Sequence, residues 1–192
     1  MTSDREGRSV PSLGFLTVVA HEQHGLFGGY LLLNPSGRPL EFHCTAPVKP
    51  NRAQEILFGP TLEAYLYGEQ IGQSLAVKAS HAPLVVLSDL PAMLALRPFV
   101  SQPVVLVLPE TEAARPAESG GDAFRRVDTA HATVRGLFTF PFGRNSLALD
   151  AAHTDDRAIA RERLAVLAET FDLAEPFGRI RAAIDEAQRS GR

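Results

Sequence analysis

Two carboxylates, Glu55 and Asp89, are the acidic side chains of this sequence that could act together in catalysis. Carboxylate oxygens are the hard ligands that a divalent cation prefers, and His21 could add a nitrogen ligand. A cation held there would activate water for hydrolysis. The residue types therefore predict a divalent metal at Glu55, Asp89 and His21. The plainer alternative is two surface carboxylates, one at a helix start and one at a strand end.

Cys44 is the only cysteine and the second candidate for chemistry, as a nucleophile. Strand alternation puts Cys44 on the same face as Leu40 and Phe42 and turns His43 to the opposite face. We therefore expect Cys44 to face the core, where a cysteine is usually an inert small hydrophobe. A reactive thiol would need a histidine from the loop at 21–24 to fold over it.

Cations beside a helix start form the third candidate, a binding site for an anion. Asn51 followed by Gln54 has the spacing of a capping box, so a helix is expected to begin there. Free backbone N–H groups, the positive end of the helix dipole, Lys49 and Arg52 would all favour an anionic group. His43, which precedes this segment, completes the predicted ligand-binding set. A routine helix cap with solvated basic neighbours is the alternative.

The elements that would position these residues belong to an α/β fold. Residues 13–46 contain three β-rich runs joined by short turns, which predicts an antiparallel meander. Helix follows, with a kink expected at Gly59-Pro60 and an apolar stripe interrupted at Glu69. Continuous apolar runs at 83–87 and 104–108 predict buried strands joined by crossovers. The strand ends and the helix start then gather at one sheet edge, where ligands bind in open α/β sheets.

The chain divides by composition into four parts. We expect a disordered N-terminal tail over 1–12, an α/β core over 13–108 and a flexible loop over 109–125 rich in Pro, Gly and Glu. Residues 126–192 continue the same domain or form a small C-terminal lobe. They contain short strands near 133–134, 136–140 and 146–149, then two helices over about 155–171 and 175–188.

Three antiparallel strands, a helix carrying Glu55 and a parallel strand ending near Asp89 resemble the first half of the ribonuclease H-like fold. The segment from Pro50 to Glu55 is similar to the helix entry of that family. The resemblance implies that Glu55 and Asp89 are metal ligands. The family also expects an acidic residue on the first strand, where this chain has only apolar residues and Thr17 before residue 20. The missing acid implies a degenerate, non-cleaving member.

Composition excludes several classes of protein. The chain has 192 residues, 45% hydrophobic and 21% charged, so it can bury a core and is not disordered throughout. One cysteine excludes an internal disulfide framework. With 22 acidic against 19 basic residues and a net charge of -3, the charge balance argues against nucleic acid as a partner. No targeting segment or membrane-length apolar stretch is present, which favours a soluble cytoplasmic protein.

Together these patterns predict a mixed sheet that starts with a three-stranded antiparallel meander, continues through β-α-β crossovers and carries C-terminal helices. The favoured function is a binding module that accepts a small anionic ligand or a protein partner at the strand-end edge near Asn51. One alternative is a metal-dependent hydrolase or nuclease-like enzyme using Glu55 and Asp89. Another is a structural or assembly protein that docks a partner through its C-terminal helices.

Overall fold

The computed structural model describes residues 11–109, 123–125, 136–167 and 171–190, and it begins with the expected meander. The three strands are β1 (Leu13–His21), β2 (Gly25–Leu33) and β3 (Pro39–Cys44). β1 and β2 are antiparallel in unbroken register, and β2 pairs antiparallel with β3. The turn between β2 and β3 is closed by the side chain of Asn34, which accepts from the backbone N–H groups of Ser36 and Arg38. The predicted meander is confirmed.

The helical segment after β3 is divided as the sequence indicates, and its winding explains the interrupted stripe. It comprises α1 (Arg52–Phe58), η1 (Gly59–Thr61), α2 (Leu62–Ala64), the π-helical η2 (Tyr65–Gly72) and α3 (Gln73–Lys78). Gly59 ends α1 with a φ of 47°. A π-helix adds a residue to the turn, so Leu66 and Ile71, five residues apart, are both buried. Glu69, which would interrupt an α-helical stripe, is left exposed.

Two parallel strands follow, with a 3-10 helix between them. The strands are β4 (Val86–Ser88) and β5 (Val104–Leu108), and the helix is η3 (Pro91–Phe99). β4 lies parallel to β1 on one side and parallel to β5 on the other. β4 begins at Val86, later than the apolar run at 83–87 predicts. The N–H of Gly14 nevertheless already donates to the carbonyl of Val85, one residue before the strand.

The C-terminal part extends the same sheet and adds two helices. It comprises β6 (Ala123–Arg125), β7 (Leu137–Phe142), β8 (Asn145–Asp150), η4 (Ala151–His153), α5 (Asp156–Leu164) and α6 (Glu175–Ser190). β8 pairs antiparallel with β5 and β7. α5 ends earlier than expected. The strand expected at 133–134 lies outside the described residues, as does most of the expected loop at 109–125. The tail at 1–12 is described only from residue 11.

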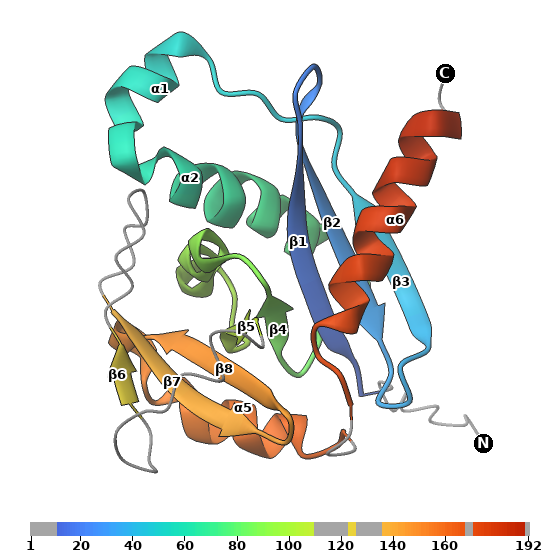
Figure 1. Cartoon of the computed structure of the whole chain (residues 1–192), viewed down its shortest axis with the longest axis vertical. Helices are drawn as coiled ribbons and strands as arrows, with labels where there is room; N and C mark the ends of the chain where they lie inside the picture. The colour runs from blue at the N-terminus through green and yellow to red at the C-terminus, as the bar shows by residue number, and fades with distance from the viewer. Residues whose placement is uncertain (1–10, 110–122, 126–135, 168–170, 191–192) are drawn as a thin grey trace, which may run out of the picture.

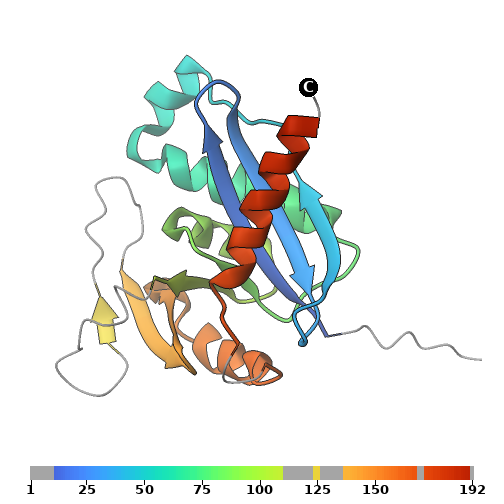
Figure 2. The ribbon, with the colours of Figure 1, turned by 45° about the vertical axis from the view of Figure 1, so that its right-hand side comes forward.

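The strands form one eight-stranded mixed sheet in the order β3-β2-β1-β4-β5-β8-β7-β6 (Figure 1). α6 contacts β1 and β2 on one face, as the turned view shows (Figure 2). The fold class predicted from the sequence is confirmed: an α/β protein with a mixed sheet, an initial meander and C-terminal helices. Among the described residues, no helix is both long enough and apolar enough to cross a membrane.

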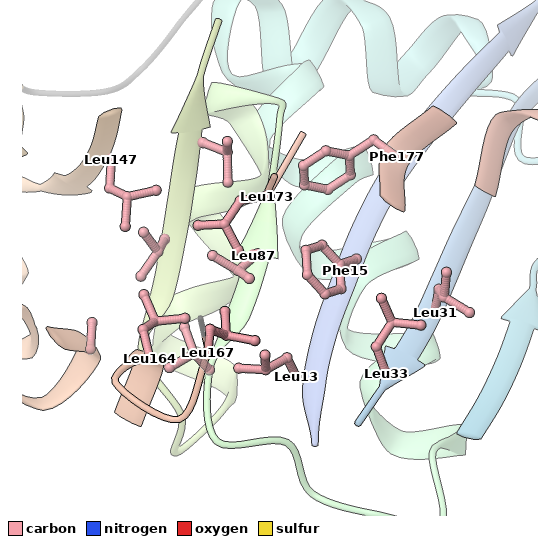
Figure 3. Packing of buried hydrophobic residues seen from close by; sticks show 14 of the residues in the cluster. Leu13, Phe15, Leu31, Leu33, Leu87, Leu147, Leu164, Leu167, Leu173 and Phe177 are labelled. Carbon is pink, nitrogen blue, oxygen red and sulfur yellow. The ribbon is translucent and has the colours of Figure 1, made fainter. Parts of the chain in front are cut away.

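Each face of the sheet has its own buried core, and successive side chains of β1 point alternately into the two cores. Leu13 and Phe15 pack with residues of α5 and α6, including Leu164 and Phe177 (Figure 3). Leu16 and Val18 point to the opposite face and join the core formed with η2, α3 and η3. Odd-numbered residues of β1 therefore lie beneath α6, which places Thr17 there.

Candidate functional site

The end of β4 carries an ion pair with the last helix. Leu16 pairs with Ser88 in the parallel register, so Thr17 and Asp89 are neighbours on adjacent strands. The Thr17 hydroxyl donates to Asp89 Oδ1 at 2.7 Å, and the Arg181 guanidinium donates to Asp89 Oδ2. Arg181 Nη2 also lies 3.4 Å from Thr17 Oγ1. Both oxygens of the Asp89 carboxylate therefore have a partner within the protein.

Close packing of α6 on the meander fixes the position of Arg181. Phe177, Ile180 and Ile184 of α6 are buried. The Phe177 ring meets the edge of Phe15, with 5.7 Å between ring centroids. A Cβ on Gly29 would lie 2.3 Å from Ile180 Cγ2, so the helix can approach this closely only because residue 29 has no side chain. The apolar packing thus holds the guanidinium against Asp89.

A cleft of about 610 Å³ opens between the strand ends and the C-terminal half of α6. Its walls include His21 and Cys44 from the meander and Gln188 and Arg189 from the helix. The volume is typical of a pocket for a small ligand or a fragment of a larger one. Gln188 Nε2 is buried without a hydrogen-bond partner, and within the described residues Arg189 has no ion-pair partner. The guanidinium of Arg189 is therefore an unpaired cation in the wall of a cleft whose lining also includes apolar side chains.

Two histidines lie together at the mouth of this cleft. His21 Nδ1 and His24 Nδ1 are 3.1 Å apart, and the backbone N–H groups of Gln23 and His24 also approach His21 Nδ1. The neighbouring segment is tied to this turn by the Lys49 amine, which donates to the carbonyl of Gln23. The predicted gathering of residues 21–24, Cys44 and Lys49 at one edge is what the structure displays.

Cys44 is exposed, and the expectation that it faces the core is wrong. Alternation along β3 is as predicted, but the faces are reversed: Leu40 and Phe42 are 38% and 39% exposed. Glu41 and His43 are instead the less exposed residues of the strand. β3 lies at the edge of the sheet, beyond β1 and β2, the strands on which α6 packs, and its apolar side chains stay partly exposed. The thiol consequently lines the cleft.

The predicted anion-binding residues lie along α1. Asn51 forms the expected capping box, because its side chain accepts from the N–H of Gln54 and the Gln54 side chain accepts from the N–H of Asn51. Arg52 pairs with Glu55 at 2.9 Å on the exposed face of this seven-residue helix. Lys49 is engaged by the Gln23 carbonyl. The cations expected to hold an anion thus each have a partner of their own.

His43 belongs to a separate cluster around Glu41. His43 Nε2 lies 2.9 Å from Glu41 Oε2, His81 Nδ1 contacts Glu41 Oε1, and the Ser80 N–H donates to Glu41 Oε2. These hydrogen bonds, from His43 first and then His81 and Ser80, lower the pKa of Glu41 from 4.5 to about 2. The cluster ties the segment after α3 to β3.

The structure does not bring Glu55, Asp89 and His21 together as one set of metal ligands. Glu55 pairs with Arg52, Asp89 with Arg181, and His21 contacts His24. Across residues 11–109, 123–125, 136–167 and 171–190, no group of three or more His, Cys, Asp or Glu side chains could hold a metal ion. The donor set of the predicted hydrolase site is therefore not assembled among these residues.

Sequence reasoning missed the contributions of α6, namely Arg181, Gln188 and Arg189. The helix itself was expected, but its spacing does not say which strands it covers. The useful signal is Thr17: a polar residue in an otherwise apolar strand must find a partner when buried, and it is 0% exposed. A search for its partner leads to Asp89 and then to Arg181.

Comparison with known proteins identifies the fold but no close relative. No family model matches the chain, and no curated protein matches it by sequence. A Ciona intestinalis endonuclease V in complex with a 23mer DNA is 13% identical, with a TM-score of 0.51 over 93% of this chain and 87% of that chain. The catalytic domain of human endonuclease V is 15% identical, with a TM-score of 0.51 over 96% of this chain and 85% of that chain.

A second Ciona intestinalis endonuclease V complex, with a 24mer DNA containing an inosine, is 11% identical with a TM-score of 0.50 over 93% and 87% of the two chains. The exclusion of nucleic acid on grounds of net charge is wrong, because proteins of this architecture are found in complex with DNA. Net charge averages over the whole surface and says little about one cleft. In architecture the chain is similar to these endonucleases, and its fold is ribonuclease H-like.

Proposed function

We propose that this chain is a nucleic-acid-binding module of the ribonuclease H-like fold that does not cleave its ligand. A phosphate-bearing strand would contact the cleft beside α6. The observation that carries the proposal is Arg189, an exposed arginine in the wall of that cleft that has no ion-pair partner among the described residues. The structures of similar architecture in complex with DNA support the choice of ligand.

The chemistry of the cleft favours an anionic group. Arg189 presents a planar set of donors that match phosphate oxygens. His21 and His24, whose Nδ1 atoms are 3.1 Å apart, add imidazole nitrogens to the same wall. Asp185 is an acidic residue in the same wall and would restrict where the phosphate lies. Phe27 and Ile184 add apolar surface for the less polar parts of a nucleotide.

The same anion was expected at the start of α1, and the cleft suits it better. The cations there are engaged: Lys49 by the Gln23 carbonyl and Arg52 by Glu55. A cleft also excludes water from the contact, whereas α1 has no buried residue. Hydrolysis through Glu55 and Asp89 is less favoured, because these carboxylates pair with arginines on different helices.

Docking through the C-terminal helices is the remaining alternative, and it has the least support. The large apolar residues of α6, Phe177, Ile180 and Ile184, are buried in the core of the protein itself. Ile159 and Val166 are exposed, at 39% and 45%. Single exposed apolar residues are ordinary on a protein surface.

Fluorescence anisotropy with labelled single-stranded and duplex DNA and RNA tests the proposal. At low salt we expect binding to at least one ligand, weakened about tenfold or more by Arg189→Ala, since a charge-assisted contact contributes about 1.5–3 kcal/mol. Affinity should fall as salt rises. The matched control is Arg38→Ala, an exposed arginine in the turn just before β3, at the opposite end of the meander from the cleft.

Three results would contradict the proposal. Absence of binding to every ligand would reject nucleic acid as the partner. Loss of binding in Arg52→Ala but not in Arg189→Ala would move the site to α1. Shortening of the labelled strand in the presence of Mg²⁺, abolished by Asp89→Asn, would favour the hydrolase.

A further inference from the structure

We infer that the guanidinium of Arg181 takes the place of a divalent cation at the end of β4, so that this chain neutralises Asp89 with a cation of its own. The resemblance to the ribonuclease H-like fold implies a metal held in part by Asp89. The residues present do not fit that metal. The disagreement has a structural cause in two positions, 17 and 181.

The first cause is that both carboxylate oxygens of Asp89 are already hydrogen-bonded within the protein. Oδ1 accepts from the Thr17 hydroxyl at 2.7 Å, and Oδ2 accepts from Arg181. The Asp89 side chain is only 19% exposed. A metal would have to displace the guanidinium and would lie beside a permanent positive charge, which opposes its binding. In the observed arrangement the carboxylate is already paired and hydrogen-bonded, as a partly buried charge requires.

The second cause is the side chain at position 17. Thr17 is 0% exposed and is adjacent to Asp89 on the neighbouring parallel strand. An aspartate there would place two carboxylates in hydrogen-bonding range of each other, the arrangement that a divalent cation stabilises. Threonine supplies a neutral donor instead. Thr17 and Arg181 therefore act in the same direction. Thr17 is neutral where an aspartate would add a negative charge, and Arg181 supplies a positive charge to Asp89.

The third consideration is that Arg181 is held in place. Ile180 and Ile184, on either side of it along α6, are buried against β2, and Gly29 allows that approach. Core packing therefore fixes the backbone of Arg181 at a position from which its guanidinium reaches Asp89. Elsewhere in the described ranges no cluster of three His, Cys, Asp or Glu residues offers the metal another site.

Binding of Mn²⁺, followed by electron paramagnetic resonance and by isothermal titration, tests the inference without any assay of activity. Wild-type protein should not bind Mn²⁺ at Asp89, so wild type and Asp89→Asn should give the same titration. The double variant Thr17→Asp/Arg181→Ala should gain binding at least tenfold tighter than the isosteric control Thr17→Asn/Arg181→Ala. Circular dichroism melts establish that each variant is folded.

Mn²⁺ binding to wild type that is lost in Asp89→Asn would overturn the inference, and so would a folded double variant that binds no better than its control. If the double variant does not fold, Arg181→Ala decides. Its melting temperature should rise with millimolar Mn²⁺ while that of wild type does not, and an equal response of the two proteins would overturn the inference. Neither outcome depends on nucleic-acid binding, so the proposed function and this inference can fail separately.

Discussion

Two arginines of α6 lie in opposite environments, and the difference distinguishes a residue that stabilises the fold from one that can bind a ligand. Arg181 is paired with Asp89 and contacts Thr17, in the part of α6 that packs on the core. Arg189 lies farther along α6, in the wall of the cleft, and has no ion-pair partner in the described parts of the chain. A charge whose partner is built into the fold contributes to stability, whereas a charge left unpaired in a cleft is available to a ligand.

Gly29→Val is the change that should disturb both regions most. A Cβ alone would lie 2.3 Å from Ile180 Cγ2 and 2.9 Å from Ile184 Cδ1, so α6 must shift away from β2. Overpacking of this kind typically lowers the free energy of unfolding by about 1–3 kcal/mol. Chemical denaturation would measure the loss, and nucleic-acid binding should weaken with it because α6 forms one wall of the cleft.

The matched control is Gly178→Ala on α6 itself, where nothing lies within 4 Å of an added Cβ. Alanine favours helix over glycine by up to about 1 kcal/mol, so this variant should be as stable as wild type or more stable. If Gly29→Val were equally stable, the close approach of α6 would not be the constraint that positions Arg181.

Arg181→Ala against Arg189→Ala tests the comparison directly. Removing Arg181 leaves Asp89 mostly buried without its counterion, and we expect a loss of about 1–2 kcal/mol in unfolding free energy, since Arg181 is itself 43% exposed. Removing Arg189 should change stability by less than about 0.5 kcal/mol. Urea denaturation at neutral pH measures both.

The two variants should have the reverse order of effect on nucleic-acid binding, with Arg189→Ala the more damaging. Equal losses of stability would show that Arg189 has a structural partner after all. Asp89→Asn/Arg181→Ala, which removes both charges, should recover part of the stability that Arg181→Ala loses.

The fold was accessible from the sequence because its signals are local. The meander is marked by β-rich runs and by the turn around Asn34, and its pairing follows from the short connections. Glu69 marks the place where local reasoning fell short. With a period of 3.6 residues per turn, Glu69 interrupts the apolar stripe of the predicted α-helix. In the structure this segment, which packs against η3, is a π-helix, and Glu69 stays on its exposed side.

The site was accessible only in part, because its two sides come from opposite ends of the chain. Topology alone gathered His21, Cys44 and Asp89 at the strand ends. It could not show that α6 packs on β1 and β2, which brings Arg181 to Asp89, while Cys44 on the edge strand β3 stays exposed. Side-chain alternation gives two faces for a strand, but which face is covered depends on distant segments.

Glu41 is a second carboxylate whose partners are built into the fold, and its effect should appear as a pH dependence. Its pKa, lowered to about 2 by His43, His81 and the Ser80 N–H, lies below the ordinary value of 4.5. The charged form is therefore favoured by folding. Its contribution to stability is present above about pH 4.5 and is lost as the pH falls toward 2. Thermal melts across this range should show the loss.

Glu41→Gln should flatten the pH dependence in that window, because glutamine does not titrate. Arg189→Ala serves as the comparison, since it removes a charge from the cleft without altering the Glu41 cluster. An unchanged slope in Glu41→Gln between pH 4.5 and 2 would assign the acid sensitivity to other carboxylates.

Cys44 gives the smallest effect on stability and the sharpest view of the cleft. Because the thiol is exposed in the cleft wall, a maleimide should modify the native protein without denaturant. We expect the adduct to leave the melting temperature nearly unchanged, because Cys44 contributes little to the core. A bulky fluorescein maleimide should nevertheless block nucleic-acid binding by filling the cleft. The anisotropy of a nucleic acid that carries a spectrally distinct label, compared between modified and unmodified protein, would report the loss.

Cys44→Ser separates the thiol from the space that its adduct occupies. This variant should bind like wild type and should be insensitive to the reagent, since serine is nearly the same size and does not react. A small adduct such as that of methyl methanethiosulfonate should interfere less than fluorescein. If modification required denaturant, Cys44 would face the core, as the alternation along its strand alone suggests. Cys44 would then not be part of the cleft wall. If modification were rapid but binding unaffected, the phosphate-bearing strand would contact a surface other than this cleft.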